Sequence, residues 1–323
     1  MFKKSAKIIS CVLATAMLLS LTACGKSEAK ISEISIACQN GLAYAPLKVM
    51  EANKLIEKYE PDVKVNWQTL NSGSAINEGL TAGAIQFGGM GLGPAITAIT
   101  SGIPVKIASA MSSQPHKIMT NRADINSLTD IKAEDKIALV NIGSFQHILL
   151  AMAAEKNFGD AHALDNNIVA MSHPDGMAAL ESGSVDCQLT TSPYIYKEAE
   201  NSNLHEVEGL SDVWPDGNSF IVFVGSESLK EKDPELYENV VKALQDAIDW
   251  INENPDEAAA LLCNELDVDE ATAKEYLTAE GAVYSSECKG VMQYADFMAS
   301  NGFLENDGPE SFSDLVFDNV KGD

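Results

Sequence analysis

The sequence predicts an α/β protein with two lobes, and three observations predict it. The chain has 323 residues, which is more than one hydrophobic core usually serves. Strand-like and helix-like segments alternate along it, and this alternation occurs twice. The composition is that of a folded chain, because 46% of the residues are apolar and 21% are charged.

The charge balance excludes several classes of partner. The chain has 22 Lys and Arg residues against 47 Asp and Glu residues, which gives a formal net charge of −25. Such a surface repels phosphate backbones, so we expect no binding to nucleic acid. Arg122 is the single arginine, which excludes any site built from several guanidinium groups.

The first residues predict export. Three lysines precede the uncharged and mostly apolar run 8–23, which together have the build of a secretory signal. The run is shorter than the ~20 residues that a membrane-spanning helix needs, and no other segment comes closer, so we expect no transmembrane domain. The sequence Leu-Thr-Ala-Cys at 21–24 resembles a bacterial lipobox. It predicts a signal peptide at 1–23, lipidation of Cys24 and a tether at 24–30, with an ordinary signal peptide as the alternative.

Four further cysteines are far apart and show no Cys-x-x-Cys spacing, which gives no support to zinc binding or thioredoxin-like chemistry. A bridge between Cys263 and Cys288 is compatible with export. We expect buried free thiols at all four positions instead, namely at Cys38, Cys187, Cys263 and Cys288.

In the first half of the chain, the period-two spacing of Ile-Ser-Glu-Ile-Ser-Ile-Ala-Cys predicts a strand at 31–38. Further strands are predicted at 63–69, 85–88 and 105–110. Helices are predicted at 44–59, at 74–82 with Ser74 as the N-cap, and at 94–101. This order of strands and helices indicates a parallel sheet covered on both faces.

The same pattern follows in the second half. Strands are predicted at 136–140, 168–171 and 187–190, and helices at 145–157, 174–182 and 193–199. A strongly apolar strand at 220–225 follows, and then helices at 234–252, 255–265, 270–278 and 289–301. This helical tail is too poor in strands for a third sheet, so we expect it to pack on the first unit.

The loops after the strands are similar to one another in composition. They are rich in Gly, Ser, Thr and Asn, each opens a helix, and they cover 39–44, 71–74, 88–94, 141–144, 172–175 and 190–194. In an open α/β sheet such loops gather at one edge, where glycine lets backbone N–H groups approach a ligand and helix N-termini add positive potential. We therefore expect a shared cleft for a small polar molecule. The alternative is that these are ordinary turn and capping residues.

No catalytic, metal or cofactor residues are predicted. The chain has no Gly-x-Ser-x-Gly or His-Glu-x-x-His motif, and the glycine run 88–93 lacks the acidic partner of a nucleotide fingerprint. No two histidines are spaced as metal ligands on a helix. His147 and His173 lie at predicted helix starts beside the cleft, and Tyr44 and Tyr194 could stack on a ligand. Asn40 belongs to the first of the loops.

Six segments carry a resemblance to a known family. They are Ala-Tyr-Ala-Pro-Leu-Lys-Val-Met at 43–50, 71–95, 127–139, Asn-Ile-Gly-Ser at 141–144, 178–186 and the helix 234–262. In this order they are similar to extracytoplasmic solute-binding lipoproteins of ABC importers, in the nitrate/sulfonate/taurine group related to the NMT1/THI5-like proteins. The resemblance covers nearly the whole chain after the leader.

The resemblance implies a two-lobed periplasmic-binding-protein-like (type II) fold, with two parallel-dominated sheets and a hinge of two crossover strands. Lobe I would consist of 31–117 and 219–323, and lobe II of 118–218. The family's ligand positions fall on residues of the loops described above, namely Tyr44, Ser72, Gly73, Ser74, Met90, Gly91, Gly143, Ser144, His173, Thr190 and Thr191.

The resemblance also implies a function, which is capture of a small polar solute outside the cytoplasm and delivery to a membrane permease with its ATPase. The partners would then be the solute, the permease and, through the lipid anchor alone, the membrane, and we expect a monomer. No candidate loop carries Arg or Lys, which favours a neutral or zwitterionic ligand, such as an aminosulfonate or a pyrimidine-type vitamin precursor, over a bare anion such as nitrate. The alternatives are a pyrimidine-forming enzyme of the THI5 type and a lipid-tethered solute sensor.

Overall fold

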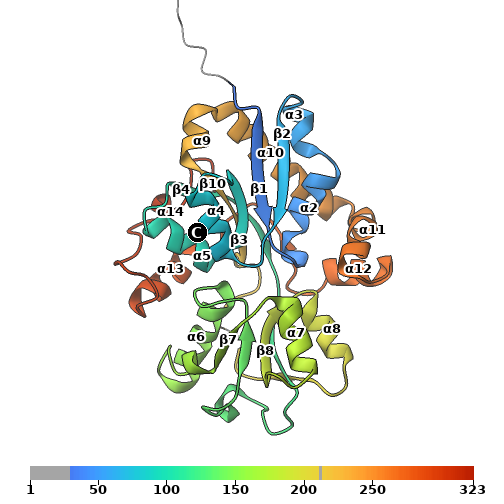
Figure 1. The fold of residues 1–323 in the computed structure, drawn as a ribbon, viewed down its shortest axis with the longest axis vertical. Helices are drawn as coiled ribbons and strands as arrows, with labels where there is room; N and C mark the ends of the chain where they lie inside the picture. The colour runs from blue at the N-terminus through green and yellow to red at the C-terminus, as the bar shows by residue number, and fades with distance from the viewer. Residues whose placement is uncertain (1–29, 211–212) are drawn as a thin grey trace, which may run out of the picture. The chain divides into compact units, whose positions relative to one another are not determined.

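Two mixed β-sheets with helices on both faces form the core of the chain (Figure 1). The structure is a computed structural model that describes residues 30–210 and 213–323, so the predicted signal peptide and Cys24 lie outside the described residues. Residues 32–323 form one compact unit. Of the described helices, none is long and apolar enough to cross a membrane.

The first sheet has six strands in the order β11-β4-β10-β3-β1-β2. The strands are β1 (Glu33–Cys38), β2 (Lys64–Thr69), β3 (Phe87–Gly91), β4 (Val105–Ser113), β10 (Ile221–Ser226) and β11 (Val283–Tyr284). The strands β2 and β3 pair with β1 in parallel, whereas β10 runs antiparallel between β3 and β4. The strand predicted at 105–110 is β4, which extends three residues further at its C-terminal end.

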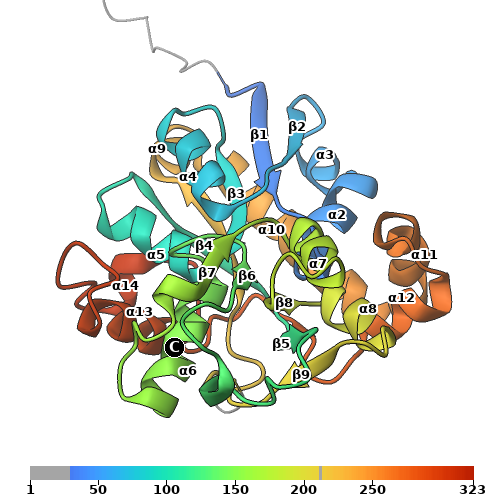
Figure 2. The same ribbon diagram turned by 60° about the horizontal axis from the view of Figure 1, so that its bottom comes forward.

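The second sheet has five strands in the order β7-β6-β8-β5-β9 (Figure 2). They are β5 (His116–Thr120), β6 (Ile137–Leu139), β7 (Ile168–Ala170), β8 (Cys187–Thr191) and β9 (His205–Val207). The pairs β6·β7 and β6·β8 are parallel, and β5 pairs antiparallel with both β8 and β9.

The two-lobed α/β fold with parallel-dominated sheets is confirmed, since four of the six strands of the first sheet and four of the five strands of the second run in one direction. Each sheet is mixed because one of its strands arrives from the other sheet. The chain leaves β4 for β5 at residues 114–115 and returns from β9 to β10, and a strand that enters from the opposite side runs against its neighbours. The expected boundary at 117/118 lies inside β5, and the division into lobe I and lobe II stays a prediction.

Helices cover the first sheet on both sides. They are α2 (Ala45–Ala52), α3 (Leu55–Tyr59), α4 (Gly73–Thr81), α5 (Leu92–Thr100), α9 (Glu227–Lys232), α10 (Pro234–Glu253), α11 (Pro255–Leu266), α12 (Glu270–Leu277), α13 (Val291–Ser300) and α14 (Phe312–Leu315). The long α10 begins at the N-cap Asp233, whose carboxylate accepts from the Leu236 N–H. Its buried residues recur at helical spacing and pack on α2, α3 and β4, so the C-terminal helices do cover the first sheet.

Two predicted helices differ from the observed ones. The segment predicted at 44–59 is a 3-10 turn η1 (Leu42–Tyr44) followed by α2 and α3, because Lys54 adopts a left-handed backbone (φ 51°) that interrupts the helix. Ser74 is not an N-cap. The cap of α4 is Ser72, whose hydroxyl accepts from the Ala75 N–H at 3.2 Å.

Three helices surround the second sheet, together with two short 3-10 turns. They are α6 (Phe145–Phe158), α7 (His173–Glu181) and α8 (Tyr194–Glu200), with η2 (Leu128–Asp130) and η3 (Asp165–Asn167). All four described cysteines are buried and unbridged, which leaves Cys263 and Cys288 as free thiols.

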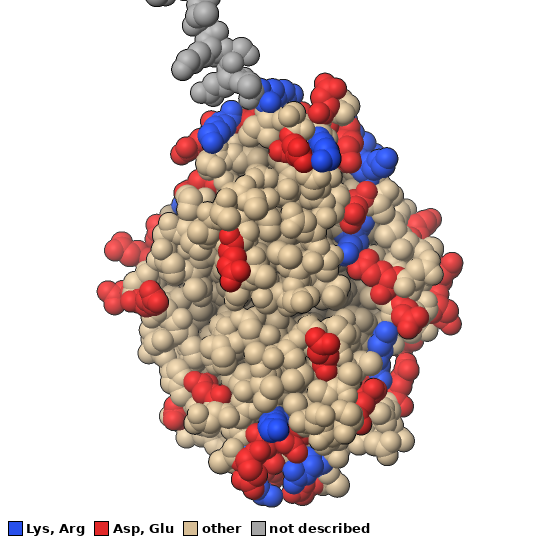
Figure 3. All heavy atoms as spheres, in the orientation of Figure 1, with Lys and Arg blue, Asp and Glu red and all other residues tan. Residues whose placement is uncertain are grey.

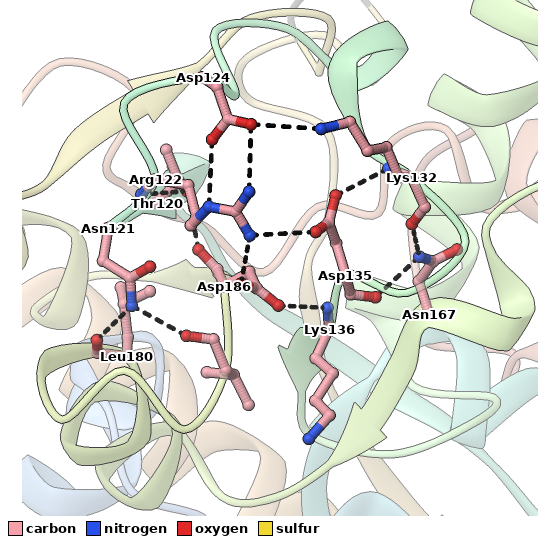
Figure 4. A network of polar contacts seen from close by, with 11 residues as sticks. Thr120, Asn121, Arg122, Asp124, Lys132, Asp135, Lys136, Asn167, Leu180 and Asp186 are labelled. Atoms are coloured by element: carbon pink, nitrogen blue, oxygen red, sulfur yellow. Dashed lines mark hydrogen bonds and ion pairs between the residues drawn. The ribbon is translucent and has the colours of Figure 1, made fainter.

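The single arginine organises the far end of the second sheet (Figure 4). Arg122 follows β5, and its guanidinium contacts the carboxylates of Asp124, Asp135 and Asp186 at 3.0–3.3 Å. Asp135 is almost fully buried, so the arginine supplies the positive charge that makes this burial tolerable. Hydrogen bonding to the guanidinium lowers the pKa of Asp124. The one guanidinium of the chain is therefore occupied within the second lobe.

Replacing Arg122 with glutamine is expected to lower the melting temperature, because three carboxylates then face one another without their common cation. The loss should be smaller at pH 4 than at pH 7, because the guanidinium lowers the pKa of Asp124 and this stabilising effect is lost as the pH falls. Circular dichroism melting measures it. Lys117→Gln, which removes an exposed pair with Glu206, is the control and should change little. Equal melting temperatures for the Arg122 variant and the control would contradict the assigned role.

Candidate functional site

A narrow pocket lies between the two lobes, where strand ends from both sheets meet. The first lobe contributes the loop after β1 and the starts of α4 and α5, and the second contributes the loop after β6, the start of α7 and the end of β8. Its lining residues are Gln39, Asn40, Gly41, Ala43, Tyr44, Gly73, Gly91, Pro94, Val140, Asn141, Ser144, Phe145, Gln146, His173, Thr191 and Phe220.

The pocket lining has no charged side chain. It carries no Lys, Arg, Asp or Glu, and its one imidazole, His173, is neutral at pH 7 because burial lowers the pKa to about 4. In Figure 3 the acidic and basic side chains gather mostly at the two ends and the edges of this face, and its middle is largely uncharged. A ligand here would be recognised by hydrogen bonds and dipoles instead of a counter-ion.

Helix N-termini point at the pocket from both lobes. Gly73, Ser144 and His173 stand at the starts of α4, α6 and α7 and all line it. The free N–H groups of a helix start carry partial positive charge, so three such ends favour oxyanion groups of a ligand. Ser144 is the N-cap of the 14-residue α6 and accepts from the His147 N–H at 3.2 Å.

Two aromatic residues of the pocket lining, Phe145 and Phe220, belong to a larger cluster of rings. The Phe145 ring of the second lobe stacks on Tyr294 at 5.2 Å between centroids and lies 4.7 Å from Phe220, both of which belong to the first lobe. His116 lies beside them at 5.0 Å from Phe145, and burial, followed by the neighbouring His173, lowers the pKa of His116 to about 3. Of these rings, Phe145 and Phe220 line the pocket and offer an apolar wall and π faces to a bound molecule.

The lobes are closed on each other. Hydrogen bonds between them join Leu42 N to Ser192 O (3.3 Å), Asn141 Nδ2 to Ser74 Oγ (3.2 Å), Tyr294 Oη to Phe145 O (3.2 Å), Lys197 Nζ to Leu266 O (2.7 Å) and His162 Nε2 to Asn301 O (2.8 Å). The space left in the pocket for the centres of water-sized molecules is about 20 Å³. That is room for about one water, so any larger solute requires the lobes to open.

The structure brings half of the predicted ligand residues together in the pocket. Those that line it are Asn40, Tyr44, Gly73, Gly91, Ser144, His173 and Thr191. Tyr194 lines a neighbouring cavity of about 250 Å³, which shares Asn40 and Gly41 with the pocket. Their role in binding stays a prediction.

The other predicted residues lie around the pocket without lining it. Ser72 caps α4, Ser74 bonds to Asn141 at the rim, and the Met90 side chain is fully buried in the core. In the second lobe, the Thr190 hydroxyl lies 2.9 Å from His173 Nδ1, and Gly143 donates its N–H to His147 Nδ1 at 3.0 Å. His147 is thus buried behind the loop and holds it, instead of facing the pocket.

Sequence reasoning missed several lining residues. Phe145 and Gln146 follow the nominated Ser144 in the first turn of α6, and Phe220 immediately precedes β10. Gln39 lies in the predicted ligand loop at 39–44 but is not among the predicted ligand residues. Its side-chain amide donates to the Tyr44 hydroxyl at 2.7 Å. Their positions in the first helical turn after the predicted loop residue Ser144 could have identified Phe145 and Gln146 from the sequence. Within residues 30–210 and 213–323, no group of three or more His, Cys, Asp or Glu side chains is placed to hold a metal ion.

Comparisons with known proteins agree with this architecture. A taurine-binding periplasmic protein of Escherichia coli (strain K12) is 27% identical over 237 residues, which cover 71% of this chain and 69% of the relative. A putative aliphatic sulfonates-binding protein of Bacillus subtilis (strain 168) is 26% identical over 278 residues, 82% of this chain and 81% of the relative.

Among solved structures, the alkanesulfonate-binding protein SsuA from Xanthomonas axonopodis pv. citri bound to MOPS has a similar fold, with a TM-score of 0.74 at 18% identity. The match covers 91% of this chain and 100% of that one. Residues 27–264 match the NMT1-like family, which is well over half of the chain. The chain belongs to the NMT1-like family.

Proposed function

We propose that the protein is the extracytoplasmic solute-binding component of an ABC importer, and that its two lobes close on a small polar solute. The observation that carries the proposal is the pocket itself, since residues of both lobes line it and its lining offers hydrogen-bonding groups but no charged side chain. Contacts made to both lobes only in the closed arrangement would shift the equilibrium towards closure. The relatives named as taurine- and sulfonate-binding proteins support it.

The pocket chemistry favours a zwitterion such as taurine as the ligand. The sulfonate oxygens would accept from N–H groups and hydroxyls at the starts of α4, α6 and α7. The ammonium group would face the ring of Tyr44, Phe145 or Phe220, where a desolvated cation is stabilised by the π face. A bare inorganic anion would leave this aromatic side of the pocket unused.

The proposal includes the remaining parts of such a system. The chain would be exported by the signal at 1–23, anchored through lipid at Cys24 and active as a monomer. The loaded protein would deliver its solute to a membrane permease that is driven by an ATPase. No cofactor is needed, because opening and closing alone bind and release the solute.

Calorimetric titration of residues 24–323 with taurine tests the proposal. We expect binding by the natural sequence and its loss, by at least about tenfold in affinity, in Asn40→Trp. Asn40 lines the pocket but is exposed, so the indole would fill the mouth without disturbing the core. Asn203→Trp, at an exposed position before β9, is the matched control and should bind normally. Unchanged affinity in the Asn40 variant would remove the pocket from the proposal, and failure of taurine and alkanesulfonates to bind at all would overturn it.

A further inference from the structure

A chain of polar contacts runs from the pocket loop to the other lobe. The Gly143 N–H donates to His147 Nδ1 at 3.0 Å, and His147 Nε2 lies 3.3 Å from one oxygen of Asp165. The second oxygen of Asp165 lies 2.7 Å from His162 Nδ1, and His162 Nε2 lies 2.8 Å from the Asn301 carbonyl oxygen. Gly143 belongs to the second lobe, whereas Asn301 ends α13 and α13 packs on α5 of the first.

The first imidazole of this chain is neutral and has a defined tautomer. A backbone N–H only donates, so His147 Nδ1 must accept from Gly143 and carries no proton. The ring proton is then on Nε2 and points at the Asp165 carboxylate. Burial of His147 lowers its pKa, which agrees with the neutral form. His147 is therefore a support that fixes the amide of Gly143 beside the ligand loop.

The contacts of the second imidazole favour its charged form. Both partners of His162 are acceptors, a carboxylate oxygen of Asp165 and a backbone carbonyl of Asn301. A neutral imidazole has one N–H and satisfies one acceptor, whereas the imidazolium ion donates to both. Hydrogen bonding to Asp165, followed by the carbonyl of Asn301, raises the pKa of His162. The cation also stands at the C-terminus of α13, where the helix dipole favours positive charge.

The groups that face His162 come from both lobes. On its own loop they are Asp165 and Asp160, and on α6 the neutral His147. From the side of α13 they are the Asn301 carbonyl and the Phe303 ring, which lies 4.7 Å from the His162 ring and 5.3 Å from that of His147. Separation of the lobes removes the Asn301 and Phe303 contacts and leaves the carboxylates.

We infer that His147, Asp165 and His162 form a positioning chain that couples the ligand loop to lobe closure, and that closure holds a proton on His162. The inference rests on the proposed function, because it describes how that site closes. Since the contact to Asn301 exists only when the lobes are closed, the pKa of His162 is higher in the closed form than in the open one. The resulting stabilisation of closure is complete below the open-form pKa and is lost as the pH rises through the closed-form pKa.

Small-angle X-ray scattering of the ligand-free protein between pH 5.5 and 8.5 tests the proton linkage. We expect the radius of gyration to increase with pH in the natural sequence and to be independent of pH in His162→Gln, which cannot be protonated. His205→Gln is the matched control: His205 also bonds to a carbonyl, that of Ile125, but within its own lobe, so it should keep the natural profile. A pH-independent radius in the natural sequence, or the same profile in His162→Gln, overturns the inference.

Amide hydrogen exchange at Gly143 tests the coupling to the ligand loop. Asp165→Asn keeps the size of the side chain but replaces one acceptor oxygen with a donor, so it cannot accept from both imidazoles. We expect protection of the Gly143 amide to fall roughly tenfold. Unchanged protection overturns the coupling. Neither readout needs a ligand, so the failure of this inference is distinct from the failure of taurine and alkanesulfonates to bind.

Discussion

Replacing Gly93 with alanine is expected to hold the lobes apart and to lower taurine affinity at least about tenfold, while the fold stays intact. Gly93 lies in the first turn of α5 and faces the second lobe. A Cβ atom there would lie 2.6 Å from the Gly143 carbonyl oxygen and 3.2 Å from the Ser144 carbonyl carbon. Both are backbone atoms, so the overlap is relieved only when the lobes separate. Alanine is also the better helix former, so α5 itself should be no less stable.

The matched control is Gly102→Ala, which should keep normal taurine affinity but lower the folding stability. Gly102 has a φ of +80°, and a Cβ there meets nothing within 4 Å. Alanine at this position strains the backbone and lowers stability, but it touches no part of the other lobe. Taurine titration and the radius of gyration at saturating taurine measure closure, and urea denaturation measures stability. Normal affinity and a normal radius in Gly93→Ala would show that this contact does not limit closure.

Replacing Glu198 with methionine is expected to stabilise the protein at pH 7 by on the order of 3 kcal/mol. Glu198 is on the buried side of α8 with 0% exposure, and within the described residues neither carboxylate oxygen has a hydrogen-bond partner. Burial, with a further contribution from Glu181, raises the pKa of Glu198 to about 8. At pH 7 the folded protein therefore holds a proton on Glu198 that the unfolded chain releases. This difference lowers the free energy of unfolding at pH 7.

The pH dependence of unfolding identifies this effect. Because the folded pKa lies above the unfolded value of 4.5, stability falls by about 1.4 kcal/mol per pH unit between roughly pH 5 and 8. Methionine has a similar volume and no charge, so the variant should lack this slope. Urea denaturation at pH 5, 6, 7 and 8 measures the difference between the two proteins. Glu155→Met, at an exposed position on α6, is the control, and an equal slope in Glu198→Met would contradict the prediction.

Most of the fold could be predicted because apolar periodicity reports directly on burial. The strand at 31–38 and the helix at 234–252 are examples, since their patterns repeat without interruption. The helix start at Ser72 could not be predicted, because Ser74 offers the same hydroxyl. The choice depends on tertiary packing: α4 begins at Gly73, where a Cβ would lie 2.4 Å from the Pro94 side chain, so glycine is the residue that fits there.

The sequence predicted which loops form the site, but it did not predict which side chains of those loops point into the pocket. Strand ends and helix starts identified the loop at 141–144, yet whether a side chain faces the ligand or the core depends on tertiary packing. His147 is the clearest example, since its spacing from Ser144 suits a ligand contact and its ring instead points at Asp165. Phe145 shows the reverse, because an aromatic residue in a helix pattern is most simply read as core, and this ring lies at the junction of two lobes.

The place of β10 in the first sheet has a consequence for the order in which the chain folds. All strands of the second sheet lie between residues 116 and 207, so that sheet is complete as soon as this part of the chain is available. The first sheet lacks its strand between β3 and β4 until residues 221–226 arrive. As the chain is synthesised from its N-terminus, the second sheet can therefore be completed early, whereas β3 and β4 have no strand between them until this later segment arrives.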